Sequence, residues 1–307
     1  MNSLFAAAGM TVFERGWLSS NNVLFDGGSS HESTLVDSGY WTHAGQTVAL
    51  VQQALGTRPL DRIVNTHLHS DHCGGNHALQ VAFGCAVEIP SGEVEKVDRW
   101  DESALTYRAT GQNCPRFRRT GAVRAGDDVR CGSRVWRAIA APGHDPESFV
   151  LYEPELQLLI SADALWENGF GVVFPELEGV NAFHEVRSTL DALSELPIRW
   201  VIPGHGRPFE NAEAAVARAH RRLDGLVTDP VRHAQYAAKV LIKFHLLEIQ
   251  RVALSALMDW LNTTRYMHLA HQRHFLQLSF ADWCLGLIDE LRLSNAVAIQ
   301  DGIVSNI

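Results

Sequence analysis

Several features that mark other classes of protein are scarce or missing in this sequence. The five cysteines are odd in number and scattered, and no two of them form the C-x-x-C pair of a zinc ribbon or a redox motif. No apolar run approaches the ~20 residues that span a bilayer. The first ten residues lack the basic region and the long apolar stretch of an export signal. We therefore expect reduced thiols, no membrane partner and a cytoplasmic location.

An excess of positive charge is also missing. The chain has 26 Lys and Arg against 35 Asp and Glu, which gives a formal charge of −9. Residues 210–307 contain ten of each sign, so the excess of negative charge lies in residues 1–209. Because binding to a nucleic acid depends on clustered Lys and Arg, the sequence predicts no nucleic-acid partner.

The 307 residues are enough for two domains, and the first of them has the texture of an α/β protein. In residues 1–209, short apolar or β-branched runs alternate with helical stretches at 45–55 and 183–196. The expected strands are 22–25, 33–37, 62–65, 134–140, 148–152, 157–161 and 200–202.

The second domain, residues 210–307, is expected to be helical. Helical spacing covers 210–227, 229–249, 252–261 and 280–292, and a hairpin that turns at Asp301-Gly302 follows. Three helices and a hairpin are the parts of a winged helix, although the neutral charge disfavours DNA binding. Packing against the first domain, lining its pocket and forming a homodimer through these helices are the roles left open.

The strongest signal in the chain is a short run of metal-binding side chains that follows the strand expected at 62–65. Extended backbone sends alternate residues to one side, so His67, His69 and Asp71 would point the same way. His72 would join them if the chain turns into a helix at the Gly-Gly pair that follows. Imidazoles and carboxylates are ligands that Zn²⁺, Fe and Mn accept, and four of them so close together can serve two ions.

Three later residues have the same setting. His144 lies in a Pro-Gly-His turn between two expected strands, Asp163 ends the run Leu158–Asp163, and His205 follows another strand in a Gly-His-Gly turn. Loops at the ends of strands are where a rigid scaffold presents its ligands. These three residues are therefore candidates for the same metal centre.

As a set, H-x-H-x-D-H followed by a Gly-His turn, an Asp and a Gly-His-Gly turn resembles the metallo-β-lactamase-fold superfamily over about residues 12–209. The glyoxalase II-like and thioesterase-like branch is the most similar. The resemblance implies an αββα sandwich of two mixed sheets with helices on the outer faces and two divalent ions at one edge, most readily Zn²⁺, with Fe or Mn as alternatives. It also implies that the first ion is held by His67, His69 and His144, that the second is held by Asp71, His72 and His205, and that Asp163 bridges both.

The same resemblance implies a hydrolase. Two ions that share a water lower its pKa toward ~7, and the resulting hydroxide would attack an ester or thioester carbonyl while Asp71 ligates a metal and orients the hydroxide. Asp37 matches a place where family members often keep an Asp. It would either orient a ligand imidazole or simply end its strand and begin the turn. A lactonase or β-lactamase-like hydrolase is the alternative within the class, and an iron-dependent persulfide dioxygenase is the alternative outside it.

The segment after Asp163 bears on the substrate. Glyoxalase II enzymes usually have a Lys or Arg there that grips glutathione, whereas this chain has neither. Trp166, Phe170 and Phe174 instead predict an apolar wall for a small-molecule acyl substrate, the alternative being that they are core aromatics beneath a loop. For a coenzyme A or phosphate group, Arg116, Arg118 and Arg119 are the candidate cations.

Overall fold

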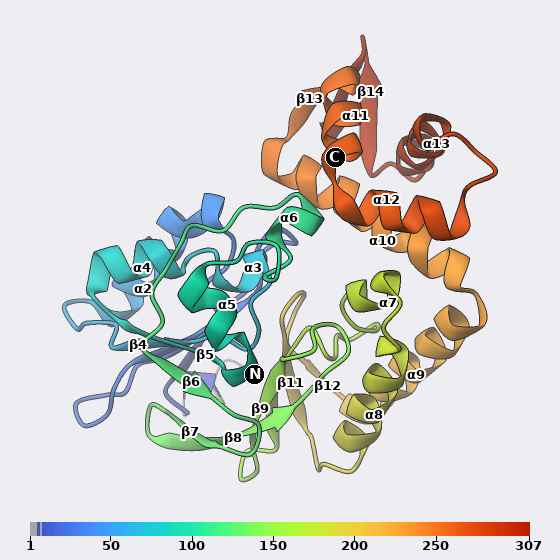
Figure 1. Cartoon of the computed structure of the whole chain (residues 1–307). Coiled ribbons are helices and arrows are strands. Elements are labelled where there is room, and N and C mark those ends of the chain that lie inside the picture. The colour runs from blue at the N-terminus through green and yellow to red at the C-terminus, as the bar shows by residue number, and fades with distance from the viewer. Residues whose placement is uncertain (1–4, 7) are drawn as a thin grey trace.

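Two six-stranded sheets form the centre of the molecule (Figure 1), seen in a computed structural model that describes residues 5–6 and 8–307. In the first sheet the strands follow chain order. They are β1 (Met10–Phe13), β2 (Asn22–Phe25), β3 (Thr34–Val36), β4 (Arg62–Val64), β5 (Ala86–Pro90) and β6 (Gly121–Val123). The pairs from β3 to β6 are parallel and the others are antiparallel, so the sheet is mixed.

The second sheet is also mixed. Its strand order is β12 (Phe209–Glu210), β11 (Trp200–Pro203), β10 (Leu158–Ala162), β9 (Phe149–Glu153), β8 (Arg134–Ala140) and β7 (Asp128–Cys131). Only β10 and β11 pair in parallel. Both strands therefore end at the same edge of this sheet, where their following loops can meet.

The alternation of side chains along the strands separates two apolar layers. Val23 and Phe25 of β2 face the second sheet and pack in one core with Trp136 of β8, whereas Leu24 faces outward into another core. Successive residues of a strand point to opposite faces of the sheet, so each sheet buries one face against its partner and needs helices over the other.

Helices cover both outer faces. The first sheet is covered mainly by α2 (Ala44–Leu55), α4 (Asn76–Phe83) and α5 (Val94–Arg99), and the second by α8 (Ala182–Ser194) and α9 (Ala212–Thr228). Shorter elements between the strands are η1 (Trp41–His43), α3 (Ser70–Cys73), η2 (Ser91–Glu93), α6 (Tyr107–Thr110) and α7 (Phe174–Glu178). The result is the αββα sandwich that the sequence predicted.

The C-terminal region continues from the sandwich without a break in packing. It consists of α10 (Pro230–Ile249), β13 (Arg251–Ala253), α11 (Leu254–Thr263), α12 (Arg265–His274), α13 (Phe280–Leu293), β14 (Val297–Gln300) and β15 (Ile303–Asn306). Its core also takes in Val172, Phe174 and Leu177, while α9 belongs to the core of the second sheet. Hydrophobic cores thus cross residue 209 in both directions, and the division of the chain at 209/210 stays a prediction.

Most expected strands and helices are confirmed to within two residues, including the hairpin at Asp301-Gly302. Both turn residues have positive φ, of 51° and 74°, as the two-residue turn of a tight hairpin requires. The helix α12 was not predicted. Among the described residues no helix combines the length and the apolar character needed to cross a membrane. The prediction on an export signal concerns Met1–Met10, of which residues 1–4 and 7 lie outside the described part.

Trp136 offers a test of the core between the sheets. Its side chain is fully buried, and the ring contacts Phe25 edge-on with centroids 5.3 Å apart. We expect Trp136→Ala to lower the free energy of unfolding by about 3–5 kcal/mol, because it leaves a large cavity. Trp136→Phe is the matched control, since it keeps an aromatic ring in the core and loses only part of the ring volume together with an indole N–H that has no partner. Equal loss for both variants in urea unfolding would contradict this packing.

Candidate metal centre

The predicted ligands come together at one edge of the sandwich, because each of them follows or precedes a strand that ends there. His67 and His69 lie between β4 and α3, and His144 lies between β8 and β9. Asp163 follows β10, and His205 follows β11. The strands fix where these loops begin, so residues far apart in the sequence become neighbours.

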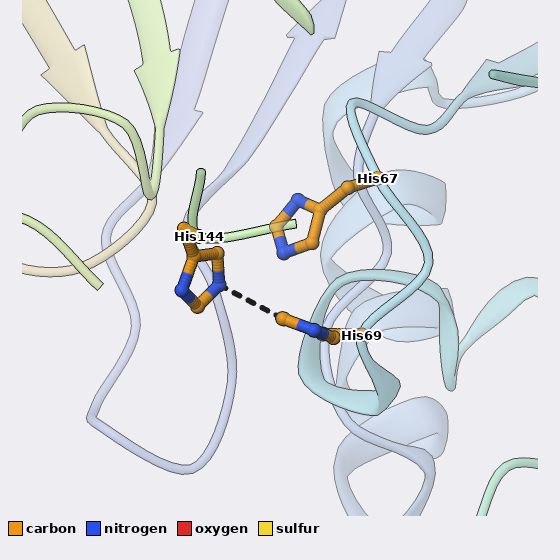
Figure 2. Close-up of side chains that lie close together, drawn as sticks. All are labelled: His67, His69 and His144. Atoms are coloured by element: carbon orange, nitrogen blue, oxygen red, sulfur yellow. Dashed lines mark hydrogen bonds between the residues drawn. The ribbon is translucent and has the colours of Figure 1, made fainter. Parts of the chain in front are cut away.

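Three histidines form the first group. One ring nitrogen from each of His67, His69 and His144 lies within 4.8 Å of the others, and Figure 2 shows the three rings facing one another. Nδ1 of His69 is 2.8 Å from Nε2 of His144. Nδ1–H of His144 donates to the Val172 carbonyl at 2.6 Å, which leaves Nε2 free of its proton and available to a metal.

Burial keeps this first group neutral. It lowers the pKa of His69 and that of His144 to about 4, and it lowers the pKa of His67 well below the usual value, with a further contribution from His72. Neutral imidazoles offer a lone pair. The group is therefore suited to a cation near pH 7.

Asp71, His72 and His205 form the second group, and Asp37 orients one member of it. Nδ1 of His72 lies 2.7 Å from Oδ2 of Asp37. The Asp37 carboxylate also accepts the backbone N–H of Thr66 at 2.9 Å and its hydroxyl at 2.8 Å. Nε2 of His205 is 3.0 Å from Oδ2 of Asp71. Asp37 therefore occupies the orienting position predicted for it, and its backbone is held at φ 57°.

Asp163 lies between the two groups. Its Oδ2 is 3.3 Å from Nε2 of His144, and its Oδ1 is 3.4 Å from Nε2 of His72. Gly204 passes so close that an added Cβ would collide with the Asp163 carboxylate. Ala162, the residue before Asp163, lies beside a β-bulge and has a φ of 45°. This backbone conformation costs free energy for residues other than glycine. The backbone is thus bent to aim this carboxylate at both groups.

The carboxylates around the second group stabilise positive charge, which a bound metal ion would supply in place of the proton on His72. Burial alone would raise the pKa of Asp163, but His205 and His72 hold it well below the usual value. Burial alone would lower the pKa of His72, but Asp163 and Asp37 raise it well above the usual value. Nε2 of His67 is buried with no protein partner, and such an orphaned atom destabilises the fold unless a ligand satisfies it. The donor set therefore fits divalent metal ions.

A cavity of about 90 Å³ opens onto these groups. Trp166 and Phe174 line it as predicted, and the indole N–H of Trp166 donates to Oδ1 of Asp163 at 3.2 Å. Phe170 does not line it. Its side chain is 1% exposed in the core beneath the second sheet, beside the Arg222 guanidinium, so its predicted place on the wall is corrected.

Sequence reasoning missed several residues of the site. Trp17 lines the cavity, and its ring stacks on His205 with centroids 5.4 Å apart. The loop that carries Trp17 is held near the centre because the backbone N–H of Ser20 donates a hydrogen bond to the Asp71 carbonyl at 2.9 Å. Oδ2 of Asp145 lies 3.8 Å from Nε2 of His69. Phe244 and Gln112 line the cavity from distant segments. Only Asp145, directly after His144, had a signal in the sequence.

Comparison with known proteins gives the class. A model described as the metallo-beta-lactamase superfamily matches residues 15–205, more than half of the chain. The chain therefore belongs to this superfamily of metal-binding hydrolases. A metallo-beta-lactamase family protein from Thermus thermophilus has a similar fold, with a TM-score of 0.56 over 97% of this chain and 99% of that one at 20% identity.

Two further likenesses narrow the comparison. The hydroxyacylglutathione hydrolase of Hyphomonas neptunium is 30% identical over 115 residues, which are 38% of this chain and 38% of that protein. The alignment thus spans well under half the length of this relative. A protein solved in a di-iron-bound form, TTHA1623, has a TM-score of 0.54 over 68% of this chain and 98% of its own at 25% identity.

Asp37 gives a test of how the centre is held. Asp37→Ala removes the acceptor for His72 and for Thr66, so we expect metal affinity to fall about 10–100-fold. Competition against a chromophoric chelator measures it. Asp61→Ala is the matched control, because Asp61 accepts the Ser33 N–H at 2.8 Å at the opposite end of β3. Loss of affinity in the control alone, or in neither variant, would contradict the role of Asp37.

Proposed function

We propose that this chain is a hydrolase that uses two divalent ions to cleave the ester or thioester bond of a small acyl compound. The observation that carries the proposal is the position of Asp163, which presents one carboxylate oxygen to each of two ligand groups. A carboxylate in this position can hold two ions close enough together to share one water.

The proposed ligand sets follow the two groups. The first ion would be held by His67, His69 and His144 and the second by Asp71, His72 and His205, with Asp163 available to both. When bound, two such ions supply hydroxide near neutral pH and polarise the carbonyl under attack. Zn²⁺ is the first candidate for a set of imidazoles and carboxylates. The di-iron form of TTHA1623 makes Fe the second candidate.

Asp71 is the proposed catalytic side chain of the protein itself. It lines the cavity, and one of its oxygens is already fixed by Nε2 of His205 at 3.0 Å. The other oxygen can accept a hydrogen bond from the attacking water and hold its lone pair toward the acyl carbon. The bond that breaks is the one between the acyl carbon and the leaving oxygen or sulfur.

The named activity of the relatives supports the thioester class. The curated proteins that match this chain at about 30% identity include hydroxyacylglutathione hydrolases. A lactonase or β-lactamase-like activity would use the same centre, so a panel of thioesters, esters, lactones and β-lactams separates these alternatives. A persulfide dioxygenase would hold one iron per chain. The cytoplasmic location and a homodimer through the C-terminal helices stay predictions.

Asp71 gives the first test of the proposal. We expect Asp71→Ala to lower kcat on a thioester at least 100-fold and to empty the second ion site, because the variant loses both a ligand and the group that orients water. Elemental analysis should then find about one ion per chain. Asp191→Ala, on the outer helix α8, is the control and should match the native protein. Native turnover by Asp71→Ala would refute the role of this carboxylate.

His144 gives an independent test of the first ion. We expect His144→Ala to lose that ion and its activity together, while chelation of the native protein removes activity that added Zn²⁺ restores. His184→Ala removes an exposed histidine from α8 and should keep both metal and turnover. Full metal content in His144→Ala would contradict the assignment.

A further inference from the structure

The cavity over the metal centre has walls that are aromatic and aliphatic. Trp17 and Trp166 meet edge-on, with centroids 5.4 Å apart, on one side of the centre. Phe174 stands on another side, stacked on Tyr266 with centroids 5.0 Å apart. The remaining apolar lining includes Phe244, which contacts Tyr40 edge-on with centroids 5.2 Å apart. Each ring is fixed by a neighbour, so the walls form a preformed apolar slot.

Part of this slot comes from the C-terminal region. Val240, Leu241 and Phe244 all belong to α10, and all three line the cavity. In Figure 1, α10 runs from the helices that cover the second sheet into the C-terminal helices. The helix therefore closes the space above the metal centre with apolar side chains.

No cation lines the cavity among the described residues. The three arginines that the sequence offered for a coenzyme A or phosphate group lie elsewhere: Arg119 is paired with Asp98, which also contacts Arg116. The carboxylates of Asp71 and Asp163 line the cavity as well, but they are ligands of the proposed ions, so positive charge there would come from those ions and not from a side chain. An anionic leaving group would thus find no positive side chain to hold it.

The polar lining outside the ligands is neutral. The Thr110 hydroxyl is occupied, since it donates to the Thr106 carbonyl at 2.9 Å. The Gln112 side chain accepts a hydrogen bond from the Ser70 hydroxyl at 2.5 Å through Oε1, which leaves its N–H groups for a ligand. A neutral donor beside apolar walls suits a carbonyl compound without charge.

The size of the cavity limits the acyl group. Its volume is about 90 Å³, whereas an engineered apolar cavity of about 150 Å³ is known to hold benzene. A group of a few carbons is the size that this space accommodates, and a longer chain would extend beyond it.

We propose that this cavity selects compact, uncharged acyl compounds, namely short-chain esters or thioesters with a neutral leaving group, held between Trp17 and Phe244. This inference rests on the proposed hydrolase function and departs from the glutathione thioester named for the relatives. Trp17 and Phe244 act as specificity-determining residues. Gln112 is the polar contact for the substrate.

The kinetic test uses one acyl group on three thiols. We expect the full chain with its metals to hydrolyse S-butyryl-N-acetylcysteamine with a kcat/KM at least tenfold above that for S-butyrylglutathione and for butyryl-coenzyme A. Octanoyl-N-acetylcysteamine should fall at least tenfold below its butyryl counterpart. If the kcat/KM for an anionic thioester or for the octanoyl compound equals that for the neutral butyryl thioester, the proposed selectivity is wrong while the hydrolase proposal still holds.

A binding test keeps the inference separate from turnover. S-(2-oxopentyl)-N-acetylcysteamine carries a ketone that cannot be hydrolysed, and calorimetry should show at least fivefold tighter binding than for the matching glutathione compound. Trp17→Ala and Phe244→Ala should each weaken it at least fivefold, while Trp41→Ala, which removes an indole outside the cavity, changes it less than twofold. Equal binding of the two compounds, or no effect of both cavity variants, overturns the proposal. If no thioester is hydrolysed but these binding differences hold, the hydrolase proposal fails and the cavity assignment stands.

Discussion

The carboxylate of Asp163 must reach His72 and His144, which come from two separate segments, and the geometry of the sandwich edge follows from this requirement. One oxygen lies 3.3 Å from His144 and the other 3.4 Å from His72. Two neutral or cationic imidazoles can share one buried carboxylate only if both are held in place. The Asp37 carboxylate holds His72, and the Val172 carbonyl holds His144. Asp37 and Val172, which are not among the proposed metal ligands, therefore determine where a metal can bind.

Part of the free-energy cost of this arrangement is strain in the backbone. Ala162 and Asp37 both adopt positive φ, and Gly204 has no room for a side chain. Such conformations persist where the surrounding structure over-determines them. Here the parallel pair of β10 and β11 fixes two of the loops, and the packed outer helices keep those strands in register. The stability of the packed sheets therefore offsets the backbone strain at the edge of the sandwich.

The strands, the helices and the candidate metal ligands could be proposed from local patterns in the sequence, whereas the αββα sandwich and the division of the ligands into two sets followed from the family resemblance. Strand ends marked by Gly and Pro turns, with His or Asp at the turn, lie near one another when strands share an edge. The walls of the cavity could not be predicted, since Trp17 and Phe244 reach it from segments more than 200 residues apart. The prediction for Phe170 was wrong for the opposite reason. Phe170 is close to Asp163 in sequence, but its side chain points into the hydrophobic core and not into the cavity.

The most direct test of the account is a crystal structure of the protein as purified, with anomalous scattering recorded at the absorption edges of Zn and Fe. The account predicts two peaks about 3.5–4 Å apart, one beside His67, His69 and His144 and the other beside Asp71, His72 and His205, with Asp163 between them. A single peak, or two peaks that do not share Asp163, would contradict it.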